Sequence, residues 1–140
     1  YMRITICGSI HFAKEMLVAK NKLEKIGHEA FIPIDTEASI CNPELNDSFE
    51  HLENFAEIDL DKDHFNKISA SDAILVLNYQ KNNINGYVGG ATLMEIAVAR
   101  HLDKKIFVLF NLPHVDVLKY VLEIRLAKPI ILSGDLNKII

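Results

Sequence analysis

Two short runs of the sequence are apolar at almost every position. Residues 73–78 read AILVLN, and residues 105–110 read KIFVLF. Successive side chains of a strand point to opposite faces of a sheet, so strands of this kind are buried on both faces. Central strands of parallel sheets have this environment, because helices pack on both sides of them. The two runs therefore predict a parallel sheet between two layers of helices.

The remainder of the chain alternates between strand and helix patterns. We expect further strands at residues 3–7, 28–32 and 130–132, and helices at residues 13–26, 55–69, 91–102 and 115–125. The side chains expected on the core side of the first two helices are Met16, Leu17, Leu23 and Ile26, and then Ile58, Phe65 and Ile68. Residues 35–54 have no clean period and contain several turn-forming residues, so we expect a loop there with at most one short helix.

This alternation predicts an α/β fold. We expect a single doubly wound, flavodoxin-like or Rossmann-like domain over residues 2–140, with a five-stranded parallel sheet in the order 2-1-3-4-5. A chain of 140 residues has room for one such domain. The residues expected in its core are Cys7, Leu75, Val76, Leu77, Phe107, Val108 and Leu109.

Composition excludes several classes of function. The formal net charge is -4 and no basic stripe stands out, which argues against a nucleic-acid partner. No apolar run approaches the roughly 20 residues that span a bilayer, and no signal-peptide pattern opens the chain. Two cysteines are too few for a disulfide framework. We therefore expect a cytoplasmic protein with no membrane partner.

Ligands of doubly wound sheets bind outside the carboxyl ends of the strands, where the strand order switches. This rule selects the loop after Cys7 and the loop after Asn78. In the first loop, Gly8 allows close approach of the backbone, and amides at the start of the helix near Phe12 attract anions. An anion such as a 5′-phosphate is expected at Gly8-Ser9-Ile10. A simple tight turn is the alternative.

The second loop is glycine-rich and leads into the helix that carries Glu95. This residue stands between Met94 and Ile96, in a segment that is apolar on nearly every side. Burial of an unpaired carboxylate is costly, which suggests a functional role for Glu95. The alternatives are that Glu95 is an exposed surface residue or that it interacts with the helix dipole. A functional Glu95 is favoured, because this helix N-terminus faces the predicted ligand crevice. We expect the helix N-terminus and loop amides to keep its carboxylate ionised.

Other titratable residues carry weaker signals. Asp72 opens a strand and so lies at the amino edge of the sheet, away from the ligand. The helix at residues 55–69 begins near the ligand edge, which gives Asp59, Asp61, Asp63 and His64 access to it; a packed or surface histidine is the alternative for His64. No histidine or cysteine has metal-ligand spacing, and no Walker lysine or full dinucleotide fingerprint is present. We expect neither a metal nor a cofactor.

Three motifs resemble the nucleoside 2-deoxyribosyltransferase superfamily, in particular its 2′-deoxynucleoside 5′-phosphate N-hydrolases. They are Cys7-Gly8-Ser9-Ile10, Ser71-Asp72-Ala73-Ile74-Leu75-Val76, and the glycine-rich loop leading into Glu95 with Ala99 four residues on. Residues 89–95 also resemble the GG-x-GT-x-x-E segment of phosphoribohydrolases that release cytokinin bases. Both families cleave N-glycosidic bonds.

The resemblance implies that Glu95 is the nucleophile that attacks the anomeric carbon of the sugar. The residues it implies for substrate binding are Gly8, Ser9, Ile10, His11, Asn78, Tyr87, Gly89 and Gly90. The chain departs from the family pattern where a carboxylate falls on His64, a tyrosine on Thr5 and a serine on Gly89. We treat His64 as a second catalytic residue, since a histidine could protonate a leaving base.

The sequence therefore predicts cleavage or transfer of the N-glycosidic bond of a nucleoside or nucleoside 5′-monophosphate. A non-catalytic nucleotide-binding module on the same fold is the alternative, and a protein whose main role is assembly is a third. The apolar helix that carries Glu95, together with the family resemblance, predicts a homodimer or larger homo-oligomer.

Overall fold

The computed structural model describes all 140 residues and contains one five-stranded sheet in the order β2-β1-β3-β4-β5. All four strand pairs are parallel, with Cys7 beside Val76 and Val76 beside Val108. The strands are β1 (Arg3–Gly8), β2 (Glu29–Phe31), β3 (Ala73–Leu77), β4 (Lys105–Val108) and β5 (Ile130–Ile131). The predicted α/β class and strand order are confirmed.

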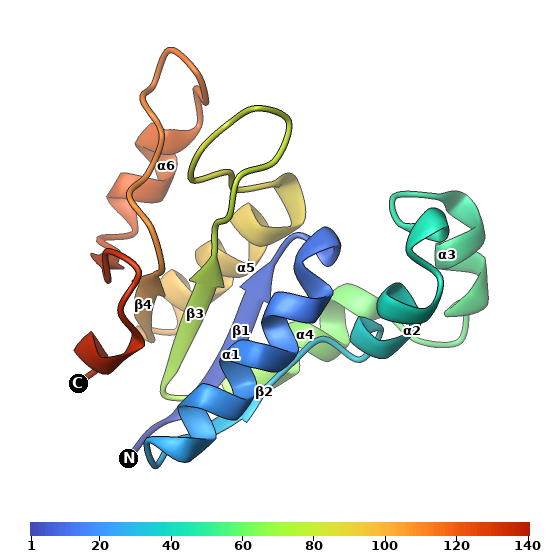
Figure 1. Cartoon of the computed structure of the whole chain (residues 1–140), viewed down its shortest axis with the longest axis horizontal. Helices are drawn as coiled ribbons and strands as arrows, with labels where there is room; N and C mark the ends of the chain where they lie inside the picture. The colour runs from blue at the N-terminus through green and yellow to red at the C-terminus, as the bar shows by residue number, and fades with distance from the viewer.

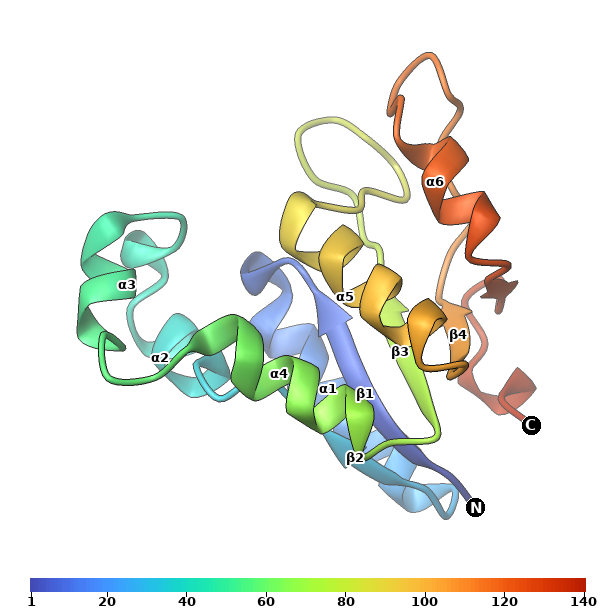
Figure 2. The same cartoon turned by 180° about the vertical axis from the view of Figure 1, so that it is seen from behind.

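Helices cover the two faces of this sheet. They are α1 (Ala13–Lys25), α2 (Thr36–Cys41), α3 (Phe49–Asn54), α4 (Leu60–Ser69), α5 (Gly90–His101) and α6 (Val121–Leu126), with short 3₁₀ turns at η1 (Ile10–Phe12), η2 (Pro43–Leu45) and η3 (Leu136–Lys138). Helix α1 lies in front of the sheet in Figure 1, and α4 and α5 lie on the opposite face, which Figure 2 turns toward the viewer. None of these helices has the length and hydrophobicity that crossing a bilayer requires.

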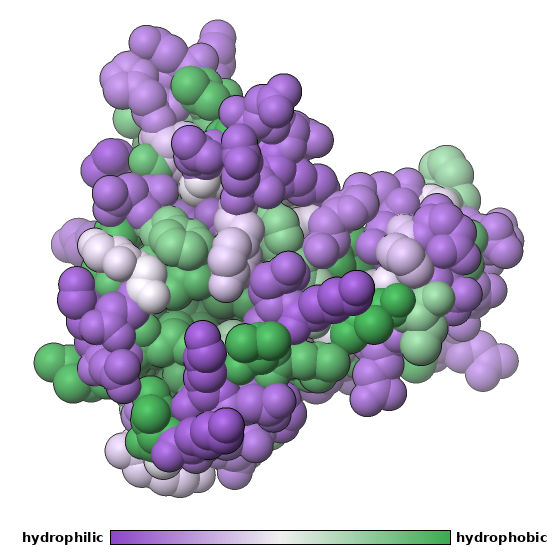
Figure 3. Space-filling model, viewed as in Figure 1, coloured by the Kyte–Doolittle hydropathy of each residue, from purple (hydrophilic) through white to green (hydrophobic).

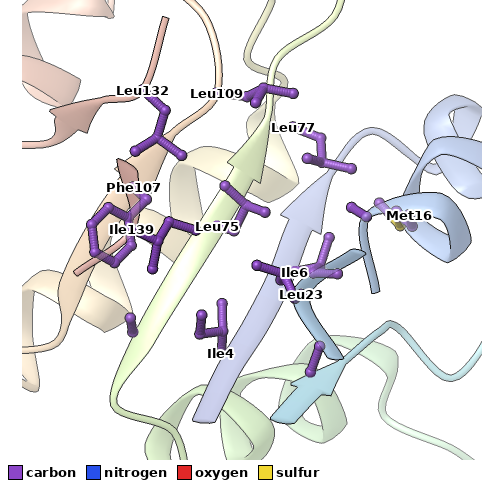
Figure 4. Close-up of a cluster of buried hydrophobic side chains, with 13 residues drawn as sticks. Ile4, Ile6, Met16, Leu23, Leu75, Leu77, Phe107, Leu109, Leu132 and Ile139 are labelled. Carbon is purple, nitrogen blue, oxygen red and sulfur yellow. The ribbon is translucent and has the colours of Figure 1, made fainter. Parts of the chain in front are cut away.

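The core consists of two clusters, one on each side of the sheet. On the α1 side, Leu75 and Leu77 of β3 pack with Ile4 and Ile6 of β1 and with Leu23 of α1 (Figure 4). On the other side, the alternate β3 residues Ile74 and Val76 pack with Ile68 of α4 and Ile96 of α5. The alternation of side chains along each strand explains this division. All seven core residues expected from the sequence are buried.

Residues 35–59 form an arm that projects beside the sheet (Figure 1) and contains α2, η2 and α3. We expected a loop with at most one short helix here, and the arm has two helices of six residues each. Hydrophobic residues lie at the surface between the body of the domain and this arm (Figure 3).

Two further helix boundaries differ from the expectation. Helix α4 starts at Leu60, so Ile58 precedes it and is 38% exposed instead of facing the core. Helix α6 starts at Val121, because turns occupy residues 115–117 and 119–120, ahead of it. At the end of α1, Ile26 is also largely exposed, since it stands at the C-cap, where the helical face no longer continues.

Candidate active site

A cavity of about 800 Å³ opens at the carboxyl edge of the sheet, between the arm, the loop after β1 and the first turns of α5. Eight of the ten site residues expected from the sequence line it: Gly8, Ser9, Ile10, His64, Tyr87, Gly89, Gly90 and Glu95. The other two, His11 and Asn78, lie outside its wall. The loops after β1 and β3 thus meet at one cavity, at the edge where sheets of this order bind ligands.

Glu95 is held in the second turn of α5 with its side chain 14% exposed. Burial raises the pKa of its carboxyl group to about 8, a hydrogen bond with the Cys7 thiol opposes this shift, and the charge of Asp35 adds to it. We expected amides to keep this carboxylate ionised. No amide donates to it and desolvation dominates instead, so the carboxyl group is mostly protonated at neutral pH in the free protein.

His64 of α4 lies against Glu95, with 3.8 Å between Nε2 and the Glu95 Oε2 atom. Its Nε2 is 3.0 Å from the backbone oxygen of Ile6, a contact in which Nε2–H donates. Burial is the main cause that lowers the pKa of this imidazole to about 4, followed by the charge of Lys67. The ring is therefore neutral at pH 7 and its proton is already engaged. This geometry argues against the expected role of His64 as the proton donor to a leaving base.

Cys7 completes a small cluster beneath Glu95. Its Sγ is 3.6 Å from His64 Nε2, and one ligand atom from each of Cys7, His64 and Glu95 lies within 4.8 Å of the others. A zinc ion can bridge ligands with this spacing. However, metal binding would require the Nε2 lone pair, and that nitrogen donates its proton to Ile6. In this arrangement Cys7 bonds to His64 Nε2 and to the Glu95 carboxyl group, and so links the two side chains.

The loop after β1 is joined to a lysine that the sequence analysis did not single out. Lys81, from the loop between β3 and α5, donates from Nζ to Ser9 Oγ at 3.1 Å. The same ammonium group is 3.7 Å from Asp47 of the arm, and Asp47 accepts a 2.6 Å hydrogen bond from His11 Nε2. The amide of Phe12, which we expected to hold an anion, donates to the Ser9 carbonyl. Ser9, Lys81 and Asp47 therefore provide polar groups at this end of the cavity.

Asn78 has a different position from the expected one. Its side chain is fully buried, accepts from the Phe110 amide at 2.8 Å and donates to the Phe110 carbonyl at 2.9 Å. It lines a second, smaller cavity, at the carboxyl ends of β3 and β4. These bonds hold the loop after β3 against the loop after β4, so the role of Asn78 is structural.

The arm contributes a pair of residues to the cavity that the sequence analysis missed. His51 of α3 and Asp35, which precedes α2, are joined by a 2.8 Å hydrogen bond, and both line the cavity. Asp35 follows the carboxyl end of β2, so the rule that selected the other two loops could also have found it. His51 has no comparable signal, because α3 is one and a half turns long and shows no period.

Neither a protein-family model nor a curated protein matches this chain. Among solved structures, it is similar to the Clostridium botulinum CMP N-glycosidase BcmB. The two chains share 17% identity over 94% of this chain and 89% of that one, with a TM-score of 0.45. A similarity this low does not identify a reaction, so the function has to be inferred from the cavity itself.

Proposed function

We propose that this protein cleaves or transfers the N-glycosidic bond of a nucleoside or nucleoside 5′-monophosphate, with Glu95 as the nucleophile. The observation that carries the proposal is the Glu95 side chain, 14% exposed, at the wall of an 800 Å³ cavity beside the loop after β1. A cavity of this volume is large enough for a nucleoside. Buried carboxyl groups with displaced pKa values are characteristic of catalytic sites.

The reaction needs a carboxylate close to the anomeric carbon of the sugar. As the bond from that carbon to the base breaks, the ionised Glu95 stabilises the positive charge that develops on the sugar and then forms an ester with it. Water releases the sugar in a hydrolase, and a second base releases it in a transferase. Because burial raises its pKa, Glu95 is more basic than an ordinary carboxylate, and its ionised, nucleophilic fraction rises as pH approaches 8.

The opposite end of the substrate is assigned to the loop after β1. Ser9 Oγ and Lys81 Nζ provide a hydroxyl and a positive charge for a 5′-hydroxyl or a 5′-phosphate. Tyr87 lies beside them, with Lys81 Nζ 5.3 Å from its ring centroid. This arrangement would place the sugar between Ser9 and Glu95.

The test is release of free base from a panel of nucleosides and 5′-monophosphates, followed by chromatography. Glu95→Gln keeps the shape of the side chain but removes its nucleophilic charge, so turnover should fall by several orders of magnitude with little change in ligand binding. Glu123→Gln, on α6 and outside the cavity, is the matched control.

The alternative is a nucleotide-binding module without turnover. In that case the ligands would raise the melting temperature of wild-type protein and no base would be released. Full turnover by Glu95→Gln would contradict the proposed nucleophile directly.

A further inference from the structure

The arm holds a histidine–aspartate pair against the cavity. His51 Nε2 is 2.8 Å from Asp35 Oδ2, and the two side chains are 8% and 13% exposed. Both residues line the same cavity as Glu95. A carboxylate bonded to one nitrogen of a largely buried imidazole is a common way to orient that ring and to stabilise its protonated form.

Local structure fixes the position of this imidazole. Ser48 caps α3 by accepting a 3.1 Å hydrogen bond from the His51 amide, and the Phe55 ring packs at 5.2 Å from the His51 ring. Asp35 stands at the N-cap of α2, where an aspartate usually accepts from its own helix. Here its side chain makes no capping bond and is turned to His51 instead.

The second nitrogen of the ring is free. Nδ1 of His51 has no hydrogen-bond partner within the protein, and it is not among the enclosed polar atoms without a partner. Nδ1 of His64 differs, because it is fully enclosed and out of reach of a ligand. Of the two histidines at the cavity wall, only His51 therefore keeps a nitrogen that a bound molecule can contact.

The pair also lies within electrostatic reach of the other buried groups. The charge of Asp35 adds to the effect of burial in raising the pKa of Glu95, and it partly opposes the effect of burial in lowering the pKa of His64. Glu95 comes from the sheet domain and the histidine–aspartate pair from the arm. A nucleoside bound between them would meet a carboxylate on one side and an imidazole on the other.

We propose that His51, oriented by Asp35, is the general acid that protonates the leaving base. This inference rests on the proposed function. In the first step, the bond between C1′ and the base nitrogen breaks, its electron pair goes to the base, and the proton on His51 Nδ1 is transferred to the base. At the same time an oxygen of Glu95 bonds to C1′. In the second step, neutral His51 takes a proton from water as the water oxygen replaces Glu95 at C1′, which restores both groups.

The competing explanation is that the pair only fastens α3 to α2. Both explanations predict that substitution of His51 disturbs the protein, so activity with one substrate cannot separate them. The need for a proton can, because it depends on the leaving base. A purine methylated at N7 leaves without one, and a 5-fluoropyrimidine needs it less than the unsubstituted base.

The experiment compares kcat/KM of wild-type and His51→Gln protein on two nucleosides. One is the best substrate of the panel, and the other is its N7-methyl or 5-fluoro derivative. With the unmodified base, His51→Gln should lose about 10²-fold to 10⁴-fold, the usual contribution of general acid catalysis. With the derivative, the loss should be at least tenfold smaller. Asp35→Asn, a change in a positioning residue, should give the same pattern with smaller losses.

His114→Gln is the control, since His114 is exposed and lies outside the cavity. An equal loss on both nucleosides would overturn the acid role and leave the pair as a structural clamp. If His51→Gln fails to fold by circular dichroism, the Asp35→Asn ratio decides between the two explanations. If wild-type protein releases no base, both the proposed function and this inference are overturned. If wild-type protein releases base but His51→Gln loses the same factor in kcat/KM on both nucleosides, only this inference is overturned.

Discussion

Glu95 and His64 are neighbours whose pKa values move in opposite directions for the same physical reason. Burial disfavours the charged form of each, which raises the pKa of the carboxyl group to about 8 and lowers that of the imidazole to about 4. Between these two values both side chains are neutral in the folded protein. The 3.8 Å contact between them is therefore a contact of neutral groups at pH 7, and not an ion pair.

This has a consequence for stability that does not depend on any substrate. Between pH 4.5 and 8 the folded protein keeps a proton on Glu95 that the unfolded chain has lost, so the free energy of unfolding falls as pH rises. Between pH 4 and 6.5 the unfolded chain holds a proton on His64 that the folded protein lacks, so this free energy rises with pH. The two effects oppose each other below pH 6.5, and only the Glu95 effect remains above it.

We predict that Glu95→Gln removes the fall above pH 6.5. The difference in unfolding free energy between Glu95→Gln and wild type should grow by roughly 2 kcal/mol between pH 6.5 and 8. Urea denaturation at several pH values measures it, with Glu123→Gln as the control. A difference that stays constant across this range would mean that the Glu95 carboxyl group titrates near its ordinary pKa.

At the scale of elements, the loop after β1 is set by its contacts with β3 and with the arm. Gly8 leaves no room for a side chain, because a Cβ atom there would lie 2.9 Å from the Leu77 carbonyl oxygen. A larger residue at Gly8 would disturb the pairing of β1 with β3, so it is a poor probe of ligand binding. Asp47 and Lys81 are better probes, since they contact the loop only through side chains.

Asp47 places a carboxylate beside Lys81 and His11, where a 5′-phosphate would have to compete with it. The hydrogen bond from His11 lowers the pKa of Asp47, so its carboxylate is charged at neutral pH. Its side chain is 65% exposed, so a phosphate in solution can displace it. We predict that Asp47→Asn binds nucleoside 5′-monophosphates several-fold more tightly, and that Lys81→Met binds them more weakly.

Isothermal titration calorimetry measures these affinities, and Asp116→Asn, at an exposed position outside the cavity, is the control. Binding of uncharged nucleosides should change little in either variant. Unchanged affinity for the monophosphates in both would place the phosphate elsewhere.

Hydrophobic periodicity predicted the elements that packing of apolar side chains decides. The strands around Val76 and Val108 and the helix that carries Glu95 are long or apolar enough to be identified, and their order follows from topology. The arm was missed because its two helices are held by particular polar bonds, such as Ser48 to the His51 amide and Asp35 to the His51 ring. Such bonds depend on single polar residues, here 3 and 16 positions apart, and leave no hydrophobic period.

The candidate site was predictable to the same extent. Residues in the loops that follow two predicted strands, such as Ser9 and Tyr87, could be placed at the cavity by rule. Asn78 satisfies the same rule but bonds to the loop after β4, a contact that cannot be inferred from one strand alone. The environment of His64 also required the structure, because the Ile6 carbonyl that accepts its proton is 58 residues away.

For the whole molecule, exposed hydrophobic residues remain at the mouth of the cavity. Phe49, Leu52 and Met94 are 83%, 55% and 50% exposed, and all three line it. We predict a homodimer or larger homo-oligomer, in which such residues would be covered. Light scattering after size exclusion should give a mass of at least twice 15.8 kDa at micromolar concentration. A mass of 15.8 kDa throughout would contradict the prediction.

The arm is one continuous insertion between β2 and α4, and this affects how the protein can diversify. In the proposed reaction, the strands and α5 position the carboxylate that meets the sugar, whereas the arm positions the imidazole that meets the base. Because the arm contributes no strand to the sheet, changes within it that keep Asp35 and His51 in place leave the order and register of the strands unchanged. Preference for one base over another can then evolve, or be engineered by grafting, separately from the chemistry at the sugar.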